Sequence, residues 1–396
     1  MSEPVQVLLT GDNNGSRWSC SAWDPKTGTN LMVYKGGGAA PLHGLALLNN
    51  KFIVTANAAK PLIHLWPINS QDQISSVRYV APGIANCLTT SIDGAFLLAG
   101  VQESIYIWEI CSGKMLQVLS KHYQAVTKLQ FVDDGSHFIS AGKDGSVLVW
   151  NLTNAVAKED NSQQPLYSFN DHALPVSDFF IGSGGMRAFL CSVSADRTCR
   201  IYDLASGSML LTLVFMDQLT CVTMDSLETK IFVGSDSGPI YLFAIHSPPR
   251  MKEYHLTNED NKSQFLGHKG GDDNVCLWHI KSKQLLRTLP HTGSITNISF
   301  FLTMRSIFNP DVRLNIVASN LSRMMEKSLN DSHVVEILVD NRIEYETETE
   351  SREGPKISSS TTEGSQEVEE LRSEVLRLKK INKELFEYSV NNVLNK

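Results

Sequence analysis

The sequence predicts an all-β fold, a ring of antiparallel four-stranded blades forming a β-propeller, followed by a C-terminal helix. Short runs of alternating apolar and polar residues lie between Gly- and Asp-rich turns, which is typical of half-buried strands. An aromatic residue also returns at intervals of 43, 42, 42, 52, 41 and 35 residues. These aromatic residues are Trp23, Trp66, Trp108, Trp150, Tyr202, Phe243 and Trp278.

A period of about 40–45 residues is that of a WD-type blade, so seven repeats predict a seven-bladed WD-type propeller over residues 1–303. In WD repeats, a His, a Ser, an Asp and an aromatic residue form a buried chain of hydrogen bonds. A buried Asp and His tolerate the loss of water only when they satisfy each other. The predicted tetrads are His122, Ser140, Asp144 and Trp150 in the fourth repeat, and His172, Ser192, Asp196 and Tyr202 in the fifth.

These His, Ser and Asp residues also allow an enzymatic interpretation, since the same residue types build hydrolase sites. The recurrence of the spacing in two successive repeats favours the structural role. No phosphate-binding glycine loop, nucleophile elbow or His-Glu-x-x-His motif occurs, and the seven Cys lack zinc spacing. We therefore expect no enzyme activity, cofactor or metal.

The two ends of the predicted ring are expected to meet. Val5–Thr10, Trp18–Asp24 and Thr29–Lys35 look like the second, third and fourth strands of a first blade that lacks its inner strand. Ser294–Phe300 is a strand without a blade of its own. We expect it to supply the missing inner strand and so remove an open sheet edge.

The seventh repeat is too short for a complete blade. His122 precedes Trp150 by 28 residues, whereas His268 precedes Trp278 by 10, so two strands are missing between Lys269 and Asp272. A splicing or gene-model artefact and a genuinely reduced blade both explain this. Either way, we expect a truncated seventh blade with exposed strand edges and lowered stability.

Three segments follow the predicted ring. Residues 304–339 are expected to pack on the propeller or on a partner, with helical spacing of apolar residues over Ile316–Leu329. Residues 340–366 are acidic and rich in Ser and Thr, as in a flexible linker. Residues 367–390 carry a heptad seam, which predicts a dimeric coiled coil, or alternatively a helix docked on its own ring. The seam residues are Val368, Leu371, Val375, Leu378, Asn382 and Leu385.

Composition narrows the function further. The net charge of -7 and the pI near 5.9 argue against an extended nucleic-acid surface. The sequence shows neither a signal peptide nor an apolar run long enough to span a membrane. We expect an intracellular protein whose faces hold other macromolecules.

Several short segments, in register over most of the chain, are similar to one family. They are Trp18-Ser19-Cys20, Tyr34-Lys35-Gly36-Gly37, Gly44-Leu45-Ala46-Leu47-Leu48, Lys121-His122-Tyr123-Gln124, His137-Phe138-Ile139-Ser140, His172-Ala173-Leu174-Pro175 and the nine residues Leu378–Phe386. They resemble the family of WD repeat-containing protein 18. The resemblance fails at Lys269–Asp272, where members carry a full blade, and is weak from Met304 to Glu363.

This resemblance implies a non-catalytic scaffold of the rixosome, which matures the large ribosomal subunit in the nucleolus and nucleoplasm. The implied partners are a proline-, glutamate- and leucine-rich helical-repeat scaffold, a testis-expressed companion subunit, the AAA ATPase midasin and the pre-60S particle. Members also self-associate through their C-terminal helices, which agrees with the heptad seam. The alternative is a substrate receptor or adaptor of a ubiquitin ligase, or a chromatin-associated adaptor. Such receptors often carry Arg shortly after a Trp-Asp pair, and Trp23-Asp24-Pro25-Lys26 lacks it.

Overall fold

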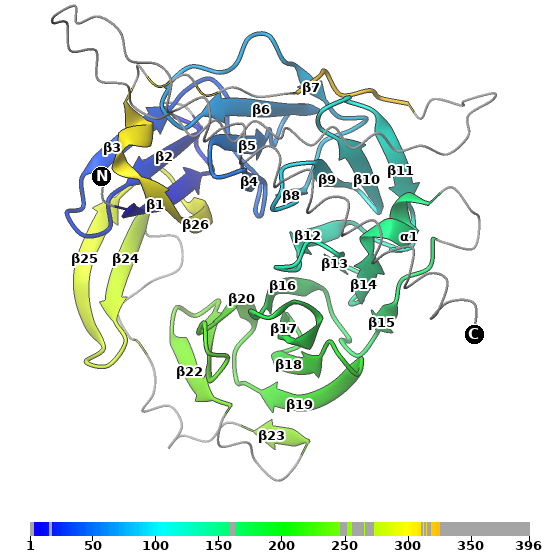
Figure 1. Ribbon diagram of the computed structural model, residues 1–396. Helices are drawn as coiled ribbons and strands as arrows, with labels where there is room; N and C mark the ends of the chain where they lie inside the picture. The colour runs from blue at the N-terminus through cyan, green and yellow to red at the C-terminus, as the bar shows by residue number, and fades with distance from the viewer. Residues whose placement is uncertain are drawn as a thin grey trace, which may run out of the picture. The chain divides into compact units, whose positions relative to one another are not determined.

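Seven small sheets follow one another along the chain in the computed structural model, and six of them form the blades of a propeller (Figure 1). The chain divides into two units, Met1–Leu338 and Val339–Lys396. The structure describes residues 4–15, 18–157, 163–245, 252–255, 265, 273–309, 312, 314 and 318–324. The predicted linker and coiled coil lie outside these residues.

Each blade is a small sheet whose strands follow one another outward from the centre of the ring, and neighbouring strands are antiparallel except β19 and β23. The first blade consists of β26 (Ile295–Met304), β1 (Pro4–Asp12), β2 (Cys20–Trp23) and β3 (Asn30–Tyr34). The second consists of β4 (Leu45–Leu48), β5 (Phe52–Ala56), β6 (Leu62–Pro67) and β7 (Tyr79–Val80). The third consists of β8 (Cys87–Thr90), β9 (Phe96–Val101), β10 (Ser104–Glu109) and β11 (Met115–Leu119). The fourth blade consists of β12 (Val126–Phe131), β13 (His137–Gly142), β14 (Val147–Asn151) and β15 (Tyr167–Phe169). The fifth consists of β16 (Val176–Ile181), β17 (Phe189–Ser194), β18 (Thr198–Asp203), β19 (Ser208–Val214) and β23 (Glu253–His255). The sixth consists of β20 (Leu219–Met224), β21 (Lys230–Ser235) and β22 (Ile240–Ala244).

The apolar core lies between the blades. In every large cluster of buried side chains, two successive blades contribute facing residues. Val7 and Leu9 of the first blade, for example, pack against Ile53 and Trp66 of the second. Because each blade buries its faces against its neighbours, much of the stability comes from contacts between adjacent repeats.

The two ends of the ring close on each other, as the sequence predicts. β26 pairs antiparallel with β1, from Pro4 opposite Met304 to Gly11 opposite Asn297, and a bulge follows at Asp12. The first blade has the strand order β26-β1-β2-β3, so the C-terminal strand is the inner strand of the N-terminal blade (Figure 1). The pairing extends beyond the expected Ser294–Phe300, to Met304.

A two-stranded sheet stands where a seventh blade is expected. It consists of β24 (Asn274–His279) and β25 (Gln284–Pro290), which packs on the first blade through Val275 and Leu289. β25 is largely exposed. Among the described residues β24 pairs with β25 alone, and the predicted truncated seventh blade is not confirmed.

The segment after the ring packs on the third blade, but its described part is not the expected helix. Ala318–Met324 lacks helical hydrogen bonding. Leu321 is buried in the core shared by the second and third blades, and the Ser322 carbonyl accepts a hydrogen bond from Trp108 Nε1 at 2.9 Å. Ser319 bonds to the backbone of Ile110. The helical expectation for Ile316–Leu329 is therefore wrong over these residues, because the apolar side chains serve an extended docking segment.

Candidate functional site

The fourth blade brings its four predicted residues together in one buried network. The Nδ1 atom of His122 lies 3.1 Å from Asp144 Oδ2, and its Nε2 atom lies 2.8 Å from Ser140 Oγ. The indole N–H of Trp150 donates to the same Ser140 oxygen at 2.9 Å. With the imidazole proton on Nδ1, every polar atom of this chain of bonds is satisfied. The network joins the loop before β12 to β13 and β14.

The carboxylate of Asp144 is held in its charged form by this network. Although partial burial opposes ionisation, hydrogen bonds from His122, Ser146 and the Tyr123 backbone N–H keep its pKa below the usual range. The Tyr123 N–H lies 2.9 Å from Asp144 Oδ2. One buried acid therefore fixes both the histidine and the loop that follows it.

The fifth blade repeats the arrangement with one difference. His172 Nδ1 lies 3.0 Å from Asp196 Oδ2, and its Nε2 atom lies 2.7 Å from Ser192 Oγ. The hydroxyl of Tyr202, however, donates to Asp171 Oδ2 at 3.1 Å. Sequence reasoning missed Asp171. A phenol extends further than an indole N–H, so Tyr202 reaches an acid of the preceding loop.

The order Asp–His–Ser in both networks matches that of a hydrolytic triad, but the nucleophile position is closed. Ser140 and Ser192 have no exposed surface, so no substrate reaches either oxygen. Ser140 Oγ also accepts the Trp150 indole N–H. The hydrogen bonds of both sets link strands within a blade, so their geometry supports a structural role.

A third network, which the sequence analysis missed, joins the two ends of the chain. Thr10 Oγ1 lies 2.7 Å from His291 Nε2 and accepts the indole N–H of Trp23 at 3.0 Å. The same indole N–H lies 2.8 Å from Ser21 Oγ. His291 Nδ1 bonds to the Leu289 carbonyl, and burial lowers the pKa of His291. The network holds β1 and β2 to the loop that enters β26.

A signal for this third network was present in the sequence. His291 precedes β26 by four residues, as His122 and His172 precede β12 and β16. Thr10 takes the place of Ser140, because each stands opposite the residue two positions before the aromatic side chain. The pattern cannot be found within one repeat, because the histidine and its hydroxyl partner lie at opposite ends of the propeller sequence.

An ion pair at the inner strands links several blades. Lys128 Nζ donates to Asp178 Oδ1 at 2.7 Å and to the Phe179 carbonyl at 2.6 Å. The other Asp178 oxygen accepts the Val222 N–H at 3.1 Å. His43 Nε2 lies 3.7 Å from Asp178, and burial, reinforced by Lys128, lowers the pKa of His43 to about 4. Neutral His43 therefore stands beside a satisfied ion pair.

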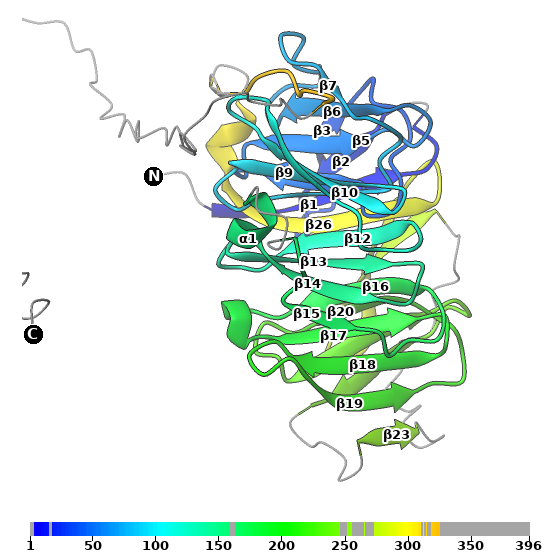
Figure 2. The ribbon, with the colours of Figure 1, turned by 90° about the vertical axis from the view of Figure 1, so that its right-hand side faces the viewer.

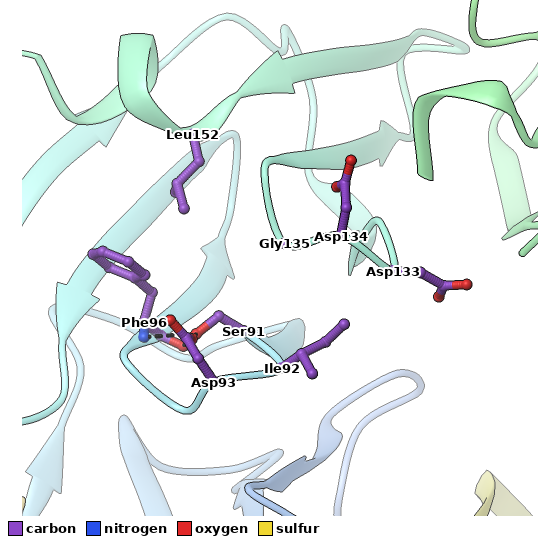
Figure 3. Close-up of a pocket in the computed structure, with 8 residues that line it drawn as sticks. All are labelled: Ser91, Ile92, Asp93, Phe96, Asp133, Asp134, Gly135 and Leu152. Carbon is purple, nitrogen blue, oxygen red and sulfur yellow. Dashed lines mark hydrogen bonds between the residues drawn. The ribbon is translucent and has the colours of Figure 1, made fainter. Parts of the chain in front are cut away.

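A shallow cavity of about 280 Å³ lies between the third and fourth blades (Figure 3). Its lining comes from the turn after β8, the turn after β12 and the start of α1 (Leu152–Val156). The lining residues are Ser91, Ile92, Asp93, Phe96, Asp133, Asp134, Gly135 and Leu152. Ser91 Oγ donates to Asp93 and has no histidine beside it, so the cavity offers acid and apolar surface without an activated nucleophile.

Within the described ranges of the chain, no group of three His, Cys, Asp or Glu side chains is placed to hold a metal ion. No helix of the same residues is long and apolar enough to cross a membrane.

Comparison with known proteins agrees with the geometry. The WD domain, G-beta repeat family model matches residues 113–151 and 163–203, which hold the two predicted tetrads. Human WD repeat-containing protein 18 is 33% identical over 427 residues, covering 98% of each chain. The chain belongs to this family. The mouse member is 38% identical over 334 residues, covering 79% of this chain and 77% of its own length.

A more distant relative carries a functional name. The pre-rRNA-processing protein pro-1 of Caenorhabditis elegans is 25% identical over 335 residues, covering 77% of this chain and 63% of the worm protein. Membership of the WD repeat-containing protein 18 family fits the networks described above, which build the frame of a propeller and leave its loops for binding.

Proposed function

We propose that this chain is a non-catalytic scaffold of the nuclear rixosome, acting in maturation of the large ribosomal subunit. The observation that carries the proposal is the likeness to human WD repeat-containing protein 18 over 98% of both chains. The pairing of β26 with β1 supports it, because it joins the two ends of the propeller into one frame that presents the loops between its blades. The mechanism is positioning of partners. A role in rRNA processing also fits the name of the worm relative.

The proposed partners are those that the family resemblance implies: the helical-repeat scaffold, its testis-expressed companion, midasin and the pre-60S particle. The proposed sites of action are the nucleolus and nucleoplasm, with some protein in the cytoplasm. Purification of the tagged chain from nuclei, followed by mass spectrometry, tests this. Recovery of large-subunit precursors and midasin supports the proposal. Recovery of cullin subunits in their place supports the ubiquitin-ligase receptor.

We further propose that two copies associate through the heptad seam at residues 367–390. A polar Asn382 at an a position favours a two-stranded coil in a fixed register. Two copies double every partner site, so avidity strengthens the assembly. The double variant Leu378→Asp with Leu385→Asp is expected to be monomeric in light scattering, with Lys379→Asp, outside the heptad seam, as the control. A dimer that persists in the double variant excludes the coil.

We also propose that β24 and β25 are the outer half of a seventh blade. The missing length between Lys269 and Asp272 equals two strands, and the two strands present pack on Leu8 and Trp23 of the first blade. The predicted cost is measurable by comparing the melting temperature of this chain with that of a chain carrying a full-length seventh blade. Equal temperatures contradict a stability cost of the truncation.

A further inference from the structure

The loops between successive blades share an unusual feature. Five consecutive loops, which enter β4, β8, β12, β16 and β20, each expose one large apolar side chain. These side chains are Leu42 (63% exposed), Ile84 (44%), Tyr123 (92%), Leu174 (48%) and Met216 (73%). We call this set the loop face. A repeated exposure of apolar side chains, one per blade, marks a binding surface more strongly than isolated exposed residues do.

The loop face lies on one side of the ring. In every blade the inner strand starts from the same side, so all inter-blade loops gather there, opposite α1 (Figure 2). The turns on the α1 side expose Ile92, Leu166 and Leu227, in the third, fourth and sixth blades. The loop face therefore differs from the other side by its regular repetition around five blades.

The buried networks fix the backbone of two loops of the loop face, those of Tyr123 and Leu174. Asp144 accepts the Tyr123 N–H at 2.9 Å, and Asp196 accepts the Ala173 N–H at 3.2 Å, next to Leu174. The Leu174 carbonyl also accepts the Ser194 hydroxyl. Because the backbone of these loops is already fixed, little conformational entropy is lost when a ligand covers their side chains.

Exposed cations stand among the apolar side chains on the same side of the ring. They lie in the same loops or in the turns between the second and third strands of the blades. These cations are Lys35, Lys60, Lys121, Lys143 and Arg197. Acidic residues lie on the same side of the ring. Glu103 and Asp236 are exposed there, and Asp171 and Asp217 accept hydrogen bonds from tyrosine hydroxyls.

The distribution of charge selects the kind of partner. The sector around Leu42, Ile84 and Tyr123 is basic, although the whole chain has a net charge of -7. On the α1 side, Asp93 and Asp133 lie at the cavity of Figure 3, and Lys51, Lys114 and Arg187 are exposed in other turns. We propose that the loop face binds an acidic polypeptide segment with spaced apolar side chains, its carboxylates facing the lysines and its apolar groups covering the exposed residues. The proposal rests on the scaffold function above and gives the chemistry of one partner.

The test uses the full-length protein and a fluorescein-labelled 16-residue peptide with Leu at every fourth position and Glu elsewhere. Fluorescence anisotropy is expected to show saturable binding that weakens with salt. Replacing Leu by Ser, or Glu by Lys, in the peptide is expected to weaken binding about tenfold or more, the size of one anchor residue. Absence of saturable binding by the Glu-Leu peptide overturns the proposal.

Variants of the protein locate the site. Tyr123→Ser with Leu42→Ser is expected to weaken peptide binding about tenfold, whereas Leu227→Ser, at an exposed residue on the other side, leaves it unchanged. Unaltered melting temperatures show that the variants fold. Equal binding by all three proteins, or displacement of the peptide by a 16-nucleotide oligouridine, overturns the proposal. The nuclear purification reports on the scaffold function separately, so either idea can fail alone.

Discussion

Two adjacent phenylalanines on β26 provide a sharp test of ring closure. Phe301 is 6% exposed and packs among Val7, Leu9 and Trp66, between the first and second blades. Phe300 is 52% exposed and points to the opposite side of the same strand. Phe301→Ala and Phe300→Ala therefore remove the same atoms from the same strand in different surroundings.

The expected costs follow from burial. A buried Phe takes about 150 Å² or more from water, which at about 25 cal/mol per Å² is about 4 kcal/mol. This agrees with the range of about 3–5 kcal/mol measured for such truncations in cores. Phe300 has lost about half of that contact with water, so its truncation is expected to cost about 1–2 kcal/mol. The two variants should differ by about 2 kcal/mol or more in the free energy of unfolding.

Urea unfolding followed by tryptophan fluorescence measures this difference, since Trp23 and Trp66 lie in the first two blades. Amide hydrogen exchange in β1 gives a second readout, because loss of the Phe301 contact loosens the strand that β26 pairs with. A difference in free energy below about 1 kcal/mol between the variants refutes the reasoning. It would mean that β26 contributes little to closing the ring.

Three further predictions concern the networks, the docked segment and acid. Thr10→Val leaves the indole N–H of Trp23 with one acceptor fewer and is expected to lower the free energy of unfolding by about 1–3 kcal/mol in urea titrations, whereas no loss contradicts the third network. Leu321→Asp is expected to release the segment on the third blade and speed its limited proteolysis, while Leu302→Asp, at an exposed residue, should not; equal rates count against the docking. The folded chain lowers the pKa of His43 from 6.5 to about 4, so between these values the unfolded chain binds more protons and stability falls as pH drops. His43→Gln should reduce the dependence of the urea midpoint on pH between 6.5 and 4. An unchanged dependence would mean that other groups cause the loss of stability in acid.

Several features could be predicted from single repeats. The strands of the fourth and fifth blades, and the His, Ser and Asp residues that the structure brings together there, follow from spacing within about fifty residues. The closing strand could also be predicted. The first blade lacks an inner strand and the last strand lacks a blade, so pairing the two removes an open sheet edge. These are consequences of local pattern and of sheet edges that must be paired.

Other features depend on contacts between distant parts of the chain. The apolar spacing of Ile316–Leu329 resembles a helix, yet Leu321 lies in an extended stretch because the third blade offers backbone partners and a buried site for it.

The sequence by itself determined the repeating strands, their turns and the meeting of the two ends, since the alternation of apolar residues and the obligation to pair sheet edges act locally. Only the tertiary structure decided that His291 and Thr10 share a hydrogen bond, and that Leu42, Tyr123 and Met216 gather on one side. Those outcomes depend on how the blades stack around the ring, which brings together residues that no interval along the chain connects.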